Sequence, residues 1–501
     1  MQIILAGYNV DYGAISDFYS GQGDRERLTP ETIAAAYARI SREQRPVNEL
    51  RALAMMEVEK ARKSNRNIVF TMGHSSIAEH AVLNIDVIGI SRLLVEELER
   101  SRLASYTEKS QRYVLLEDDF VIPEEIRKAC LEADFVAAIG EQNRLYHKLY
   151  ACLRTHVFEK HPDLADDPKN CSLLEGWAKE DARYVIALAT ETQLGMTINA
   201  RSLEAMIRRL AASPLSEARE CSRLLYEVAA SIAPSLVRYV EPSDYDLLTD
   251  RELAEKTARL RATSGAEKEH ISSSRNDREV VLIHATSDAD DRVVAALLYS
   301  SADLSGRECR EIVARMDPGD KAEVIKTACR HMRSYDSVRR EFENVDLHFE
   351  LTVSASCFAQ LKRHRMATIN CQDYNPSLGV TVPEAVRAAG MERDFSEVVA
   401  RTEAVYAKLK KSAPTAAAYI LTNAHRRRVA MKVNARELYH IARLRGDQYA
   451  QWDIRQTADK MTALAREVMP LTLMLATGKD DFPRLYDSIF QPGKFQGKKG
   501  E

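Results

Sequence analysis

An internal repeat constrains the fold of this 501-residue chain more than any other feature of its sequence. The segment Ile122–Glu124 (Ile-Pro-Glu) returns as Val382–Glu384 (Val-Pro-Glu), and Ile198–Arg201 (Ile-Asn-Ala-Arg) returns as Val433–Arg436 (Val-Asn-Ala-Arg). These landmarks occur in the same order in both halves, with a period of about 240 residues, as expected of a duplicated domain. We therefore expect two copies of one fold in a single chain.

The boundaries of the copies follow from where the patterns restart. We expect a first repeat at 1–245, a polar linker at 246–279, a second repeat at 280–490 and a polar tail at 491–501. Within the repeats, alternating apolar residues typical of strands, as at 81–90, are combined with helical patterns, as at 29–40. This mixture predicts an α+β fold.

Composition excludes several classes of protein. The formal net charge is only −3, so bulk charge favours neither nucleic acid nor a membrane as a partner. No apolar run reaches the length of a bilayer crossing, and the first residues resemble a strand more than a signal peptide. The eight cysteines are scattered without a Cys-x-x-Cys pair, which favours reduced thiols, a cytoplasmic location and no metal site. Rossmann and P-loop glycine motifs are missing from the sequence.

The stretch 100–113 concentrates cations and hydroxyls and reads Arg-Ser-Arg-Leu-Ala-Ser-Tyr-Thr-Glu-Lys-Ser-Gln-Arg-Tyr. A helix expected over 91–103 would present it, and arginine forks bind phosphate through parallel hydrogen bonds. A solvated basic surface is the alternative interpretation of one such stretch. However, a related cluster occurs at 363–365 (Arg-His-Arg), where a helix expected over 355–365 ends, and this recurrence favours a functional role.

Both stretches resemble the signature of the flavin-dependent thymidylate synthase family, Arg-His-Arg-x-x-Ser-x-Asn-Glu-x-Ser-x-Arg-Tyr. The first repeat departs from it at Ser101, which replaces His, and at Thr107, which replaces Asn. The second repeat begins Arg363, His364, Arg365 and keeps Asn370, with Thr368 for Ser, and then departs. The resemblance covers both halves. It implies two tandem repeats of that family's fold, with a mixed α/β core, an antiparallel sheet and long helices.

The family also has a Gly-His-x-(Ser/Thr)-x-x-Glu-His stretch that contacts the flavin. The first repeat keeps this stretch at 73–80, whereas the second repeat retains only the position of Glu343. The resemblance therefore implies FAD as cofactor, with NADPH and methylenetetrahydrofolate as co-substrates. The flavin contacts that it implies are His74, Ser76, Glu79, Asn199, Arg201, Arg363, His364, Arg365, Asn370, Asn434 and Arg436.

The family's dUMP site takes two sets of residues from different subunits, and each repeat here keeps a different set. The first repeat keeps Glu108, Ser110 with its neighbour Gln111, Arg112 and Arg183, where the second has Cys371, Asp373, Asn375 and Ala418. The second repeat keeps Gln360, Arg363 and Arg445, where the first has Glu97, Arg100 and Leu210. The two sets together would complete one composite site. Independent decay of a former enzyme is the alternative explanation.

The resemblance implies methylation of dUMP to dTMP, with the cofactor supplying the difficult step. Arg112 and Arg183 would bind the phosphate with help from Ser110, and Gln360 would bind sugar or base. Arg363 and Arg445 are the catalytic candidates, because they would stabilise negative charge that develops on the uracil. The partners implied are a nucleotide and a folate, in a homodimer of tandem chains equivalent to the family's tetramer, with neither nucleic acid nor membrane.

Alternatives stay open at two levels. The departures at Ser101 and Thr107 leave room for another pyrimidine nucleotide or another one-carbon group, and a non-catalytic nucleotide-binding regulator is a third function. Among single residues, Ser110 is interpreted as a hydrogen-bonding group rather than a nucleophile. Asn434 and Arg436 would serve equally well to cap and brace a helix. The run 425–428 (His-Arg-Arg-Arg) is interpreted as a solvated face.

Overall fold

A computed structural model describes residues 1–264 and 279–491, and these form two compact units. Unit 1 comprises Met1–Glu269 with Glu384–Thr422, and unit 2 comprises His270–Pro383 with Asn423–Glu501. A segment of the second repeat thus packs with the first, so the units and the predicted repeats divide the chain differently. Part of the predicted linker, 265–278, and the tail residues 492–501 lie outside the described residues.

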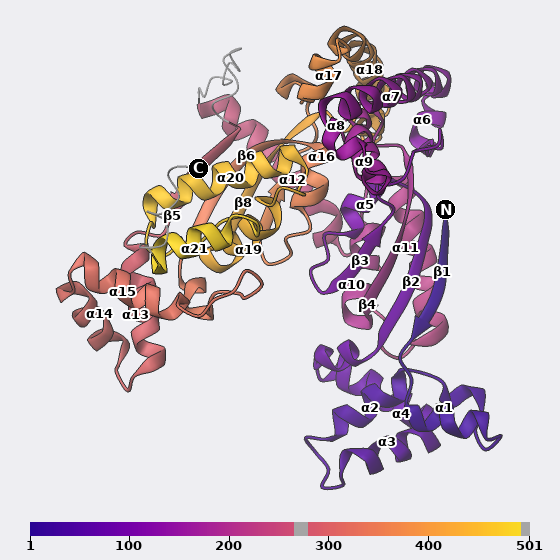
Figure 1. Cartoon of the computed structure of the whole chain (residues 1–501). Helices are drawn as coiled ribbons and strands as arrows, with labels where there is room; N and C mark the ends of the chain where they lie inside the picture. Colours follow the sequence, from indigo (N-terminus) through magenta and orange to yellow (C-terminus); the bar gives the residue numbers. More distant parts are fainter. Residues whose placement is uncertain (265–278, 492–501) are drawn as a thin grey trace. The chain divides into compact units, whose positions relative to one another are not determined.

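Unit 1 is built on a four-stranded antiparallel sheet (Figure 1). Its strands run in the order β1 (Gln2–Tyr8), β2 (Val82–Ser91), β4 (Glu191–Asn199) and β3 (Ala104–Glu108). Alternate residues of β2 and β4 are buried, and Ile85 pairs with Met196, so one face carries a continuous apolar layer. The core continues into α10 (Ala200–Ala211) and α11 (Ser216–Ile232), which bury leucines such as Leu203 and Leu225.

Unit 2 repeats this arrangement. Its strands run in the order β5 (Val280–Ala285), β6 (Asp346–Ser354), β8 (Arg426–Asn434) and β7 (Thr368–Cys371), all antiparallel. The helices α19 (Ala435–Arg445) and α20 (Trp452–Val468) share its core. Because strand order and direction match those of unit 1, the predicted duplication of an α+β fold with antiparallel sheets is confirmed.

Each unit carries a small helical group between its first two strands. In unit 1 this group includes α2 (Glu31–Arg39), α3 (Val47–Met56) and α4 (Val58–Arg66), packed through a small apolar core. Glu57, whose backbone is not helical, separates α3 from α4. In unit 2 the group consists of α13 (Ala289–Ser301), α14 (Gly306–Arg315) and α15 (Pro318–Cys329).

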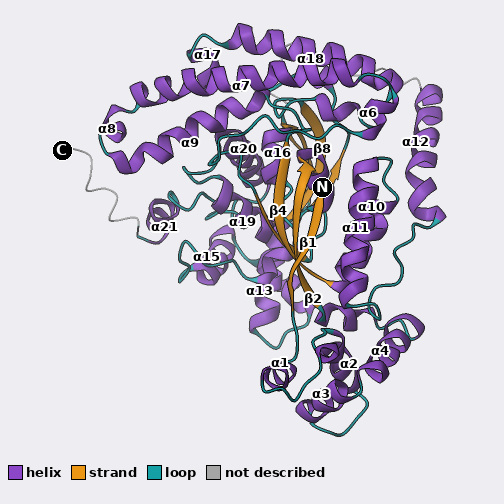
Figure 2. Ribbon diagram, turned by 90° about the vertical axis from the view of Figure 1, so that its right-hand side faces the viewer, coloured by secondary structure: helices purple, strands orange, loops and turns teal. Residues whose placement is uncertain are grey.

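Long helices from both repeats pack side by side within unit 1. Figures 1 and 2 both show α7 (Glu132–Lys160) alongside α18 (Glu392–Ser412). The buried amide of Gln142 donates to Thr402 Oγ1 at 2.8 Å and to the carbonyl of Ile420 at 2.9 Å. Beyond α18, the backbone N–H of Leu188 donates to the carbonyl of Leu421 at 2.7 Å. The segment 384–422 is thus an integral part of unit 1.

The two helices expected before the cationic clusters are shorter than predicted. They are α5 (Arg92–Leu98) and α16 (Ala355–Leu361), so most of the stretch 100–113 lies on a turn, on β3 and on the following loop. In unit 1 the Tyr106 hydroxyl donates to the carbonyl of Leu98 at 2.9 Å, which satisfies an acceptor of the last helical turn. The chain then returns to the sheet because β3 pairs with β4.

Among residues 1–264 and 279–491, no helix combines the length and the apolar character that a bilayer crossing requires. The eight cysteines form no disulfide with one another.

Candidate functional site

Two predicted phosphate ligands contact the same residue, Glu180, in unit 1. Arg112 lies in the loop after β3, and Arg183 opens the short helix η5 (Arg183–Val185) that follows α9 (Cys171–Ala182). Arg112 Nη1 lies 3.0 Å from Glu180 Oε2, and Arg183 Nε donates to the carbonyl of Glu180 at 3.2 Å. Burial lowers the pKa of Arg183, and the positive charge of Arg112 acts in the same direction, whereas Glu180 opposes the shift. The structure therefore brings the two arginines together around Glu180, a residue that the family signature does not contain.

The other predicted substrate residues of the first repeat, at positions 108, 110 and 111, lie just before Arg112 in the sequence. The Glu108 side chain is only 5% exposed and forms an ion pair with Arg92. The Ser110 hydroxyl accepts a hydrogen bond from the Arg112 backbone N–H at 3.2 Å, so its observed role is to shape the loop. This contact agrees with the interpretation of Ser110 as a hydrogen-bonding residue. Gln111 is 5% exposed and anchors the loop in the protein interior.

The predicted flavin stretch in unit 1 forms a turn that presents polar side chains to solvent. Gly73 has φ +77°, and the short helix η3 (Ser75–His80) follows, with His74 and Ser76 exposed. Glu79 Oε1 lies 2.5 Å from Arg201 Nη1. Asn199 caps α10, since its Oδ1 accepts from the Ser202 N–H at 2.8 Å. The imidazole and hydroxyl donors suit a polar cofactor, so these side chains fit the flavin contact that the resemblance implies.

Unit 2 keeps the supporting pair of this arrangement without the Gly-His stretch. Arg436 Nη1 lies 2.7 Å from Glu343 Oε1, which corresponds to the pair of Arg201 with Glu79. Asn434 caps α19 by accepting from the Glu437 N–H at 2.8 Å. Asn434 and Arg436 thus do cap and brace a helix, and a flavin contact by either one stays a prediction.

The second-repeat substrate residues converge on a buried histidine. Arg445 Nε donates to His364 Nε2 at 3.0 Å, and Arg445 Nη2 donates to the carbonyl of Gln360 at 3.2 Å. The Gln360 side chain in turn donates to Gln451 Oε1 at 3.4 Å. His364 is 3% exposed, and burial lowers its pKa, so the ring is neutral near neutral pH. Arg445, His364 and Gln360 therefore form one cluster, whereas Arg363, Arg365 and Asn370 are exposed beside it along the chain.

An arginine of the first repeat makes contacts like those of Arg445, although alignment of the two repeats does not identify it. Leu210, which aligns with Arg445, is buried in the core. The preceding residue, Arg209, donates to the carbonyl of Glu97 at 2.8 Å and approaches Ser101 Oγ at 3.4 Å. Glu97 and Ser101 align with Gln360 and His364, so a guanidinium shifted by one residue makes the corresponding contacts. As the sequence predicted, the first repeat has no arginine at the position that aligns with Arg445. Arg209 nevertheless makes the corresponding contact with the carbonyl of Glu97.

The run 425–428 is not a solvated face. His425 is fully buried, and Arg426 Nη2 lies 3.1 Å from Glu279 Oε1. The Arg427 guanidinium lies 4.7 Å from the ring centroid of Phe358 and 4.4 Å from that of Tyr374. These basic residues therefore stabilise the beginning of β8, an inner strand of the unit 2 sheet, through an ion pair and cation–π contacts.

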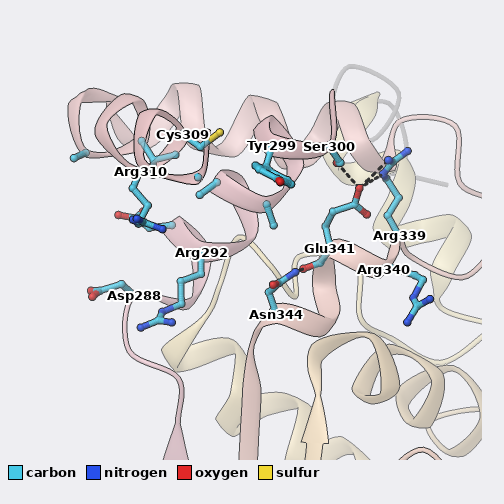
Figure 3. Close-up of a pocket in the computed structure, with 16 residues that line it drawn as sticks. Asp288, Arg292, Tyr299, Ser300, Cys309, Arg310, Arg339, Arg340, Glu341 and Asn344 are labelled. Atoms are coloured by element: carbon cyan, nitrogen blue, oxygen red, sulfur yellow. Dashed lines mark hydrogen bonds and ion pairs between the residues drawn. The ribbon is translucent and has the colours of Figure 1, made fainter. Parts of the chain in front are cut away.

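A groove of about 1030 Å³ opens in unit 2 between α13, α14 and the short helix η7 (Arg340–Asn344). Figure 3 shows Arg292 and Arg310 at one end, and Glu341 between Arg339 and Ser300 at the other. Hydrogen bonding from Arg339, helped by Ser300, lowers the pKa of Glu341 to about 2. None of the predicted site residues lines this groove, so it is distinct from the predicted substrate site.

Comparison with known proteins matches both repeats to one family. The family model described as "Thymidylate synthase complementing protein" (Thy1) matches residues 26–235 and again 281–471. A flavin-dependent thymidylate synthase of Clostridium tetani is 32% identical over 217 residues, which cover 43% of this chain and 83% of that protein. A UPF0159 protein of Thermoplasma acidophilum is 24% identical over 485 residues, which cover 87% of this chain and 93% of that protein.

Among solved structures, the UMP/dUMP methylase PolB from Streptomyces cacaoi, bound with 5-Br dUMP, matches with a TM-score of 0.33 and 21% identity. The match covers 40% of this chain and 95% of that one.

Proposed function

Because this chain belongs to the Thy1 family of flavin-dependent thymidylate synthases and carries the family's domain twice, we propose that it methylates dUMP to dTMP. The cluster of Arg112, Glu180 and Arg183 carries the proposal. Arg112 contacts the carboxylate of Glu180, and Arg183 contacts the backbone carbonyl of the same residue. Two neighbouring guanidinium groups suit a phosphate monoester, which would accept hydrogen bonds from both arginines as it binds.

The overall reaction replaces the hydrogen at C5 of uracil by a methyl group. Methylenetetrahydrofolate would supply the carbon, a proton would leave C5, and NADPH would be the source of the reducing electrons. FAD, when bound, would supply the hydride chemistry. His74, Ser76, Glu79, Asn199 and Arg201 would hold it, with the second-repeat flavin contacts named above.

The protein's own side chains would orient the nucleotide and stabilise charge. Arg112 and Arg183 would fix the phosphate, and Arg445 would stabilise negative charge on a uracil oxygen as C5 becomes nucleophilic. Because each repeat keeps a different set of substrate residues, we propose that one ligand is served by both repeats. We propose as well a cytoplasmic homodimer of tandem chains.

Release of tritium from C5-labelled nucleotides tests the reaction. Purified protein would be incubated with FAD, NADPH and methylenetetrahydrofolate, and with labelled dUMP, UMP or dCMP in parallel. We expect release from dUMP above the other two, and its loss in both Arg112→Ala and Arg445→Ala. Release of tritium from UMP or dCMP alone would show that the substrate is that nucleotide and not dUMP. Binding without release from any of the three would identify a regulator and overturn the enzymatic proposal.

A further inference from the structure

A buried carboxylate stands behind the histidine that contacts Arg445. Glu437 lies in the first turn of α19, is 6% exposed, and places Oε1 at 3.3 Å from His364 Nδ1. The negative charge is favoured there because the amino end of a helix carries partial positive charge. Glu437, His364 and Arg445 therefore form a continuous chain of contacts within unit 2.

The chain of contacts fixes the tautomer of His364. Arginine Nε–H is only a donor, so His364 Nε2 must accept the hydrogen bond from Arg445. The proton of the neutral ring then resides on Nδ1, where it is donated to the carboxylate of Glu437. Arg445 is thereby held at Nε by His364 and at Nη2 by the carbonyl of Gln360, which sets the plane of its guanidinium.

The first repeat has a corresponding arginine contact but lacks the histidine and the carboxylate. Ser101 stands in the position of His364, and Ser202 in that of Glu437. Arg209 still reaches the carbonyl of Glu97, but its buried Nε has no hydrogen-bond partner among the residues that the structure describes. The fold thus accepts an arginine here without the carboxylate and the histidine. Their presence in the second repeat points to a requirement of the site rather than of the fold.

We propose that Glu437 is a positioning residue, which fixes the His364 tautomer and so orients the Arg445 guanidinium toward the pyrimidine. This proposal rests on the proposed function, because the reaction defines what Arg445 is oriented for. The family resemblance assigns no role to position 437.

Three variants test the proposal. Glu437→Ser places the first-repeat residue at this position and removes the acceptor for Nδ1–H, whereas Glu437→Gln keeps a neutral acceptor. Ser202→Ala, at the matched position of the first repeat, is the control, and its activity should equal that of the wild type. We expect Glu437→Ser to lower kcat by about 10- to 100-fold with a smaller change in KM, because a misplaced transition-state contact affects kcat first. Glu437→Gln should recover most of that loss.

Nitrogen NMR of the His364 ring provides a readout that does not depend on turnover. Wild type should show Nδ1 protonated, and Glu437→Ser should show a mixture of tautomers. The groups that influence the ring charge are Glu437, His440 and Arg445, and Glu437 is the one that raises the His364 pKa. The pKa of His364 should therefore fall further in Glu437→Gln, while its tautomer is retained.

The outcomes separate this proposal from the proposed function. An unchanged tautomer in Glu437→Ser, or an unchanged kcat in an active enzyme, would overturn the positioning role. A wild type without activity toward any of the three nucleotides would overturn the proposed function. The tautomer measurement would then still decide whether Glu437 controls His364.

Discussion

Arg112 Nη1 lies 3.0 Å from Glu180 Oε2, and this ion pair is only partly accessible to solvent. The Glu180 carboxylate holds the Arg112 guanidinium in place before any ligand arrives. Since Arg183 donates to the backbone carbonyl of the same residue, Glu180 organises both predicted phosphate ligands. A nucleotide phosphate would compete with the carboxylate for Arg112, so binding should depend strongly on the guanidinium fork.

Arg112→Ala should weaken dUMP binding by about 10- to 100-fold, the range expected for losing a hydrogen bond to a charged group. Binding of deoxyuridine, which lacks the phosphate, should hardly change. Calorimetric titration with both ligands measures the difference. The exposed Arg144 on α7 offers a matched control, and Arg144→Ala should bind both ligands like the wild type. Equal losses for dUMP and deoxyuridine would contradict a phosphate contact.

The contact between α7 and α18 should be a major contribution to the stability of unit 1. Gln142 is fully buried and donates to Thr402 and to the carbonyl of Ile420. Gln142→Ala would leave a cavity and a buried carbonyl without its donor, so the free energy of unfolding should fall by about 2–3 kcal/mol.

Denaturant titration measures this loss of stability, and an exposed ion pair between the same two helices provides the control. Lys408 Nζ lies 2.7 Å from Asp134 Oδ2 on the same pair of helices, where both side chains are exposed. Lys408→Ala should therefore cost less than about 1 kcal/mol. Comparable losses for the two variants would show that Gln142 does not anchor the segment 384–422.

Glu217 should make the stability of unit 1 depend on pH. Its carboxylate accepts from the Ser91 N–H and hydroxyl at 2.7 Å and from the Tyr419 hydroxyl at 2.6 Å. Burial nevertheless raises the pKa of Glu217, and these hydrogen bonds only partly oppose the shift. The folded state therefore binds the proton more tightly than the unfolded state does, and the resulting stability is complete below about pH 4.3.

This contribution should be lost as the pH rises from about 4.3 through the raised pKa of Glu217 in the folded state. Glu217→Gln removes the titrating group, so its unfolding free energy should decrease less over that window than that of the wild type. Denaturant titrations at a series of pH values compare the two slopes. Identical slopes would show that the folded-state pKa of Glu217 is not raised.

The alternating apolar residues at 81–90 predicted a half-buried strand correctly, because burial of one sheet face leaves a period of two in the sequence. Helix ends were less predictable. The residues after Leu98 and Leu361 continue a helical pattern, yet pairing of β3 and β7 with the central strands ends both helices early. Tertiary pairing of this kind overrides local propensity and leaves little trace in the local sequence.

Within the candidate site, residues that match the family signature were predictable and their partners were not. Glu180 and Glu437 occupy positions that the signature does not define, so only their contacts reveal them. Arg209 was missed for another reason. An alignment compares positions along the chain, whereas a long arginine side chain one residue away reaches the same carbonyl. Two adjacent arginines at the end of α10 were the only signal in the sequence.

The first repeat should contribute the principal FAD contacts, because it keeps the exposed His74 and the pair of Glu79 with Arg201. Purified protein should gain flavin absorbance when FAD is added. Both His74→Ala and Arg201→Ala should weaken FAD binding by about tenfold, through loss of a polar contact in each case. Arg208, whose guanidinium pairs instead with Asp246 at 3.4 Å, provides the control, and Arg208→Ala should bind FAD normally. Flavin binding that survives both substitutions would exclude the Gly73–His80 stretch as the principal flavin contact of this chain.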